Sequence, residues 1–100
     1  MKYTKYTIVS FKYPKLSFTD TLNSAEIDFV NDAFQKAMLM TAEGKTPGHH
    51  EDMGDGSAKR LWIDMAAAEE WKQFIFDNAQ KHNIEVLGVE IFDATEKDNI

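Results

Sequence analysis

The segment Arg60–Trp71, RLWIDMAAAEEW, constrains the fold more than any other part of the chain. Its first residues alternate between apolar and polar side chains as in a strand, and the alanines and glutamates that follow Asp64 are strong helix formers. Asp is a favoured N-cap because its carboxylate accepts a hydrogen bond from the first turn of a helix. The segment therefore predicts a strand that passes at Asp64 directly into a helix.

The runs on either side of this segment predict an α+β domain. In chain order, the pattern predicts a strand at 6–13, a helix from Asn23 or Ser24 to Gly44, an edge strand at 49–53, a strand at 58–64, a helix from 65 to about 82 and a strand at 84–92. This order is typical of a ferredoxin-like βαββαβ sandwich, an antiparallel sheet with two helices on one face. The density of Pro and Gly around 47–56 leaves open whether 49–53 is an edge strand or a loop.

Length and composition limit the class of protein. The 100 residues are expected to form a single domain over 1–100, with 1–5 and 94–100 as frayed termini. Cysteine is absent, which excludes disulfides and thiolate metal sites. The net charge of −6 repels phosphate groups, so neither nucleic acid nor a membrane is expected as a partner. Without a signal-peptide pattern at the N-terminus, the expected location is cytoplasmic.

The two faces of the predicted sheet are expected to differ in role. Toward the helices we expect Val9, Phe11, Leu61, Ile63, Leu87 and Val89. The open face is then expected to form a ligand or interface surface from Tyr6, Ile8, Arg60, Trp62, Val86 and Phe92. Burial in a homodimer is the favoured explanation, and the alternative is a ligand cavity in which Trp62 stacks on a planar substrate and Arg60 neutralises its anionic group.

The apolar spacing of the first helix predicts which of its residues lie in the core. Ile27, Val30 and Phe34 recur at helical intervals and are expected to face the sheet. On that basis, Phe34→Ala should cost roughly 3–5 kcal/mol of stability.

The strand pattern, together with the longer block RLWIDMAAAEEWKQF, resembles the dimeric α+β barrel group of ferredoxin-like proteins, which includes the antibiotic-biosynthesis-monooxygenase-like proteins. The resemblance implies homodimers that pair through their open sheet faces. It also implies chemistry in a cavity between that face and the helices or loops, often without a metal or cofactor, although some members bind haem.

One polar cluster, HHED at 49–52, contains residue types that can bind a metal ion. His49, His50 and Asp52 are the candidate ligands, yet an extended backbone places only one imidazole and one carboxylate on each face. A zinc site takes about three or four ligands, so His82 or Asp64 would have to join them. An exposed polar hairpin is therefore favoured, and no cofactor is expected.

Two hypotheses for function follow. The first is a small acidic accessory protein that self-associates through its open sheet face and binds a protein partner. The alternative is a cofactor-independent small enzyme or small-ligand binder of the dimeric α+β barrel type, which would use Tyr6, Arg60, Trp62 and His49 or His50 around a cavity of roughly 300 Å³ or more.

Overall fold

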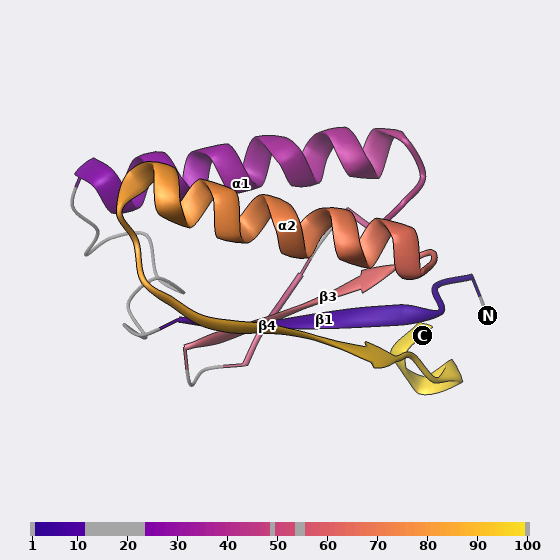
Figure 1. Cartoon of the computed structure of the whole chain (residues 1–100). Helices are drawn as coiled ribbons and strands as arrows, with labels where there is room; N and C mark the ends of the chain where they lie inside the picture. Colours follow the sequence, from indigo (N-terminus) through magenta and orange to yellow (C-terminus); the bar gives the residue numbers. More distant parts are fainter. Residues whose placement is uncertain (1, 12–23, 49, 54–55, 100) are drawn as a thin grey trace.

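A computed structural model describes residues 2–11, 24–48, 50–53 and 56–99 (Figure 1). Its elements are β1 (Lys5–Phe11), α1 (Ser24–Ala42), β2 (Glu51–Asp52), β3 (Ser57–Trp62), α2 (Met65–His82), β4 (Val86–Asp93) and the short 3₁₀ helix η3 (Glu96–Asn99). No helix in these ranges is both long and apolar enough to cross a bilayer.

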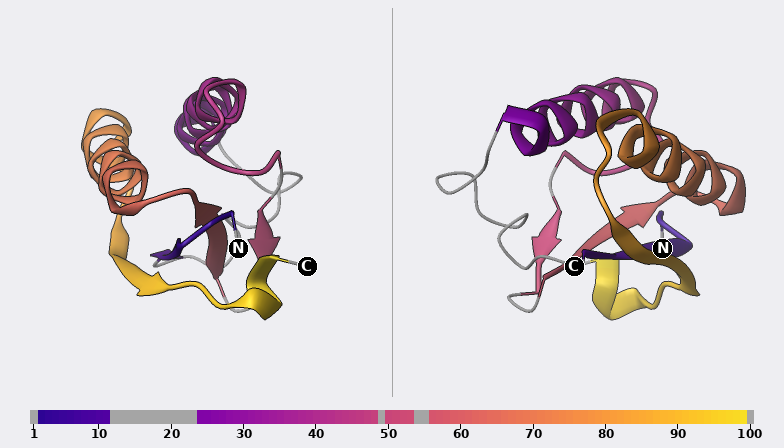
Figure 2. Two further views of the ribbon diagram at one scale, coloured as in Figure 1. Left: turned by 90° about the vertical axis from the view of Figure 1, so that its right-hand side faces the viewer. Right: turned by 60° about the vertical axis from the view of Figure 1, so that its left-hand side comes forward.

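The sheet is antiparallel and has the strand order β2-β3-β1-β4. Three strands are long, and β2 adds only two residues to the edge of β3. Both helices run antiparallel to each other over one face of the sheet, whereas η3 lies on the opposite side (Figures 1 and 2). The predicted α+β class, with an antiparallel sheet and two helices, is confirmed.

The N-cap of α2 is the one that the sequence predicts, and the helix ends close to the predicted position. The Asp64 carboxylate accepts a hydrogen bond of 2.9 Å from the backbone N–H of Ala67, as an N-cap does. Asn83 ends the helix in the left-handed conformation, at φ 56°. The direct passage from β3 into α2 is therefore confirmed.

The core lies between the sheet and the helices, but the sequence assigned β3 to the wrong faces. Core residues are Val9, Ala37, Met40, Trp62, Ala67, Ala68, Trp71, Ile75 and Val89. Trp62 is 0% exposed and its ring centroid lies 5.3 Å from that of Trp71 of α2. Its indole N–H donates a 2.9 Å hydrogen bond to Oγ1 of Thr7, so burial of the ring leaves no unpaired donor.

The sheet faces predicted for Arg60 and Leu61 are wrong as well. Arg60 pairs with Thr7 in the β1–β3 register and therefore faces the helices, with its guanidinium 5.3 Å from the ring centroid of Trp71. Burial there lowers the pKa of Arg60 to about 10. Leu61 pairs with Tyr6 and faces the other way. The polarity alternation could not decide between these two arrangements; the larger apolar area of Trp62 decides it.

A bulge in β4 explains why the faces predicted for Val86 and Leu87 are wrong. Ser10 pairs with Gly88 whereas Phe11 pairs with Val86, so Leu87 is an extra residue in the ladder. The bulge inverts the alternation: Val86 packs against the core and Leu87 is exposed. The predictions that Val86 lies on the open face and that Leu87 faces the helices are both wrong.

Helix α1 is rotated from its predicted orientation. Phe29 and Met40 are fully or almost fully buried, at 1% and 0% exposure, while Phe34 is 63% exposed and Ile27 is 42% exposed. The prediction of Phe34 as a core residue is wrong, because apolar residues occupy most sides of this helix and the sheet can cover only one.

The described residues near the two ends of the chain are hydrogen-bonded to each other. The backbone N–H of Ala94 donates to the carbonyl of Thr4 at 2.9 Å, and Ala94 is buried. Asn99 exchanges two hydrogen bonds of 2.9 Å with the backbone of Tyr3. Residues 1 and 100 lie outside the described ranges.

Candidate functional site

The open sheet face keeps three of its six predicted residues. Tyr6, Ile8 and Phe92 alternate with inward-facing neighbours and so point away from the helices. The rings of Tyr6 and Phe92 stack with centroids 5.1 Å apart. Trp62 has no exposed surface with which to stack on a substrate here, so the predicted pairing of Trp62 and Arg60 on this face is not present.

The C-terminal segment 94–99, which we call the strap, passes over part of this face (Figure 2). Nζ of Lys59 on β3 lies 2.6 Å from Oδ1 of Asp98 on η3, and 4.4 Å from the ring centroid of Tyr6. The hydrogen bond from Lys59, followed by one from the backbone N–H of Thr95, lowers the pKa of Asp98 to about 2. The same contact with Asp98 raises the pKa of Lys59.

A small cavity lies beside the strap. It measures about 220 Å³ and is lined by Pro47, His50, Glu51, Lys59, Leu61, Lys97 and Asp98. This volume is smaller than the roughly 300 Å³ at which small-molecule sites begin. Two of its charged groups, Lys59 and Asp98, are paired with each other.

The structure does not bring the candidate metal ligands together. Within the part of the chain that it describes, no three His, Asp or Glu side chains form a group able to hold a metal ion. Nδ1 of His50 lies 3.4 Å from Nη2 of Arg60, and Asp52 belongs to β2. His49 lies outside the described residues. His82 contacts Oδ2 of Asp32 at 2.8 Å, while Asp64 caps α2.

One group of exposed large apolar side chains that the structure describes is on α1. We call it the α1 stripe: Ile27, Phe34, Met38 and Leu39, which are 42%, 63%, 56% and 65% exposed. Asp28 is the single charged residue among the exposed residues of α1, although 28% of the chain is charged. Loss of charge together with exposed aromatic and Met side chains is typical of the centre of a protein interface.

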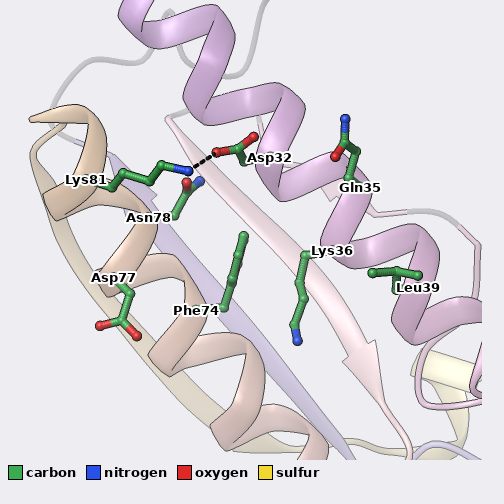
Figure 3. A pocket seen from close by; sticks show the side chains of 8 residues that line it. All are labelled: Asp32, Gln35, Lys36, Leu39, Phe74, Asp77, Asn78 and Lys81. Carbon is green, nitrogen blue, oxygen red and sulfur yellow. Dashed lines mark hydrogen bonds and ion pairs between the residues drawn. The ribbon is translucent and has the colours of Figure 1, made fainter.

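A groove between α1 and α2 adjoins this stripe and holds a cavity of about 360 Å³ (Figure 3). It is lined by Asp32, Gln35, Lys36, Leu39, Phe74, Asp77, Asn78 and Lys81. Phe74 of α2 and Lys36 of α1 lie in the gap between the two helices. Because Leu39 belongs to both the groove and the stripe, the two form one continuous surface.

The lysines of the groove already have partners within the chain. Lys36 lies 2.8 Å from Glu70, and Lys81 lies 3.4 Å from Asp32. Hydrogen bonds from Lys36 and then Lys45 lower the pKa of Glu70, and the hydrogen bond from His82 is the main cause that lowers the pKa of Asp32. These groups hold the helices together and are therefore poorly placed to act on a substrate.

Comparison of the chain with protein-family models, with curated proteins and with solved structures gave no match. The sequence carried one signal for the α1 stripe: a helix with apolar residues on most sides, more than one sheet can cover.

Proposed function

We propose that this protein is a non-catalytic interaction protein that binds a protein partner through the α1 stripe. The observation that carries the proposal is the exposure of four large apolar side chains on α1, a helix whose exposed residues include a single charged one, Asp28. Such surfaces mark contact sites, because single exposed apolar residues are common but contiguous groups are not.

Photo-crosslinking in the cells that express the protein tests the proposal. A benzophenone amino acid replaces Phe34 on the stripe or, as a control, Glu69, which is also exposed but does not line the groove. We expect discrete protein adducts from position 34 and none from position 69. Adducts from both positions, or from neither, would contradict a specific contact at α1.

A second variant separates binding from folding. Leu39 is 65% exposed, so Leu39→Ser should change the free energy of unfolding by no more than about 0.5 kcal/mol. In the same crosslinking experiment it should weaken the adduct from position 34. An unchanged adduct would place the contact elsewhere on the molecule.

Self-association through the open sheet face is the second candidate. The strand order β2-β3-β1-β4 and the two helices on one face support a ferredoxin-like topology, and the stacked pair Tyr6 and Phe92 gives that face an apolar centre. The strap lies over part of the same face, so a dimer of this kind would compete with it. Removal of residues 94–100 should then raise the dimer fraction in sedimentation experiments, and Phe92→Glu should lower it again.

A further inference from the structure

The α1 stripe runs along the exposed side of the helix: Ile27, Phe34 and Met38 lie along one line of the helix, and Leu39 lies about 100° around the axis from Met38, on the side of the groove. From Ile27 to Leu39 it covers about 18 Å of helix, given a rise of about 1.5 Å per residue. The backbone groups of this stretch of α1 are bonded within the helix, so they cannot pair with an added strand. Recognition must therefore occur through packed side chains. A helix of three to four turns, with apolar residues at intervals of three and four, fits a surface of this shape.

The groove beside the stripe offers a place for one side chain of such a helix. Its apolar part is formed by Phe74, which lies in the gap between the two helices (Figure 3), and by Leu39 of α1. A large apolar side chain that enters beside Leu39 would contact both helices of this protein, while its neighbours on the same helix face would contact Phe34 and Met38. Ridges that pack into grooves in this way are the usual geometry of helix contacts.

The charges at the edges of this surface favour a basic partner. Asp28 is exposed on α1 and Asp77 lines the groove from α2, and neither has an ion pair with another described residue. The two lysines of the groove, by contrast, are each paired with a carboxylate of the chain. Asp77 accepts a 3.0 Å hydrogen bond from Nε2 of Gln73, but neither carboxylate is neutralised by a described lysine or arginine. The surface therefore presents negative charge at its edges, and the molecule as a whole carries a net charge of −6.

From these contacts and charges, and resting on the proposed function, we infer that the partner presents an amphipathic helix with Lys or Arg beside its apolar face. A second copy of this chain fits less well, since it would bring another Asp28 and another six net negative charges to the contact. An anionic membrane surface is repelled for the same reason, and helices that bind such surfaces carry basic residues, which the exposed side of α1 lacks.

A displayed peptide library tests the inference on the intact protein. The peptides have 18 residues, a fixed helical face of Leu and Phe, and random residues at the flanking positions. We expect the selected peptides to be enriched in Lys and Arg over Asp and Glu by at least threefold relative to the unselected library. Binding of a synthesised winner should weaken at least tenfold in the double variant Phe34→Ser/Leu39→Ser.

Two double variants then test which acidic residues favour binding of the basic peptide. Asp28→Asn/Asp77→Asn should weaken the same peptide by about fivefold or more and reduce the effect of added salt on its Kd. Glu69→Gln/Glu90→Gln removes the same charge at two exposed positions outside the surface, and it should change the Kd less than twofold. Equal losses in the two double variants would overturn the role of Asp28 and Asp77.

The remaining outcomes distinguish failure of the inference from failure of the proposed function. Selected peptides with neutral or acidic flanks would overturn the basic partner and leave the interaction surface standing. A wild-type dimer that Phe34→Ser dissociates would identify a second copy as the occupant and overturn the inference alone. If no peptide distinguishes the wild type from Phe34→Ser/Leu39→Ser and no adduct forms at position 34, both fail. Binding to phosphatidylcholine vesicles that depends on Phe34 would also overturn both.

Discussion

At the scale of single residues, the contact between Trp62 and Thr7 shows how a polar atom can be buried without penalty. The indole N–H of Trp62 donates to Oγ1 of Thr7 at 2.9 Å, and both side chains are fully buried. Alternation alone cannot show that a Trp faces the core, because its N–H requires a partner there. Thr7 provides that partner from the neighbouring strand.

A double-mutant cycle tests this pair. Trp62→Phe keeps most of the apolar volume but removes the donor, so it should destabilise the protein by about 1–3 kcal/mol. Trp62→Phe combined with Thr7→Val should cost less than the sum of the single changes, since the unpaired hydroxyl is then gone. The measurement is the free energy of unfolding in urea. Additivity within about 0.3 kcal/mol would mean that the hydrogen bond contributes nothing of its own.

Two phenylalanines of α1 offer a second comparison between residues. Phe29 is 1% exposed and Phe34 is 63% exposed. Phe29→Ala should therefore cost about 3–5 kcal/mol, and Phe34→Ala less than about 1 kcal/mol. Chemical denaturation of both variants provides the test. Similar costs at the two positions would contradict the orientation of α1 and, with it, the exposed stripe.

At the scale of elements, the strap depends on an ion pair between η3 and β3. Its contact with Lys59 lowers the pKa of Asp98 from an ordinary value of 3.8 to about 2. A lowered folded-state pKa contributes stability at pH values above the unfolded value, and this contribution disappears as the pH falls from about 4 to about 2. The raised pKa of Lys59 implies a second loss in strongly alkaline solution, as the pH passes above 10.5.

The corresponding experiment compares the wild type with Asp98→Asn. The variant should be less stable at pH 6, and the difference should shrink steadily below pH 4 because the wild-type carboxylate is then protonated too. Urea denaturation across this range measures the difference. Asp93→Asn serves as the matched control, because Asp93 also pairs with a lysine, Lys5, but its side chain is 85% exposed. A constant difference for Asp98→Asn from pH 6 to pH 2 would contradict the ion pair.

At the scale of the whole molecule, exposed apolar residues gather at more than one place. The α1 stripe contributes four of them, whereas Leu87 and Phe92 lie on β4 at the opposite layer. If the stripe is the dominant surface, Phe34→Ser/Leu39→Ser should shorten retention on a hydrophobic-interaction column more than Leu87→Ser/Phe92→Ser does. If Leu87→Ser/Phe92→Ser shortened retention more than Phe34→Ser/Leu39→Ser, β4 and the open face would be the better candidate for a contact site.

Local signals in the sequence were sufficient for the two helices, whereas strand ends shifted by up to two residues and the segment 49–53 stayed open between an edge strand and a loop. Asp64 caps α2 because its carboxylate reaches the next turn of its own helix, and Asn83 ends that helix through its own backbone conformation. Local signals did not show which face of each strand is buried. Arg60 and Leu61 alternate equally well in either orientation, and the bulge at Leu87 inverts the pattern midway along a strand. These features depend on a partner strand, and the local pattern carries a sign of only one of them, because Gly88 beside the extra residue predicts a possible bulge.

The sequence by itself determined the α+β class, the passage from strand to helix at Asp64 and the approximate extent of each helix and strand, because caps, propensities and periodicity act over a few neighbouring residues. The tertiary structure alone decided which side of each element is buried. That choice depends on register and on the competition among apolar side chains for a single interior, in which Trp62 enters the core and Phe34 stays outside. The candidate site lies on α1 for this reason: the interior has room for only one face of a helix that is apolar on most sides.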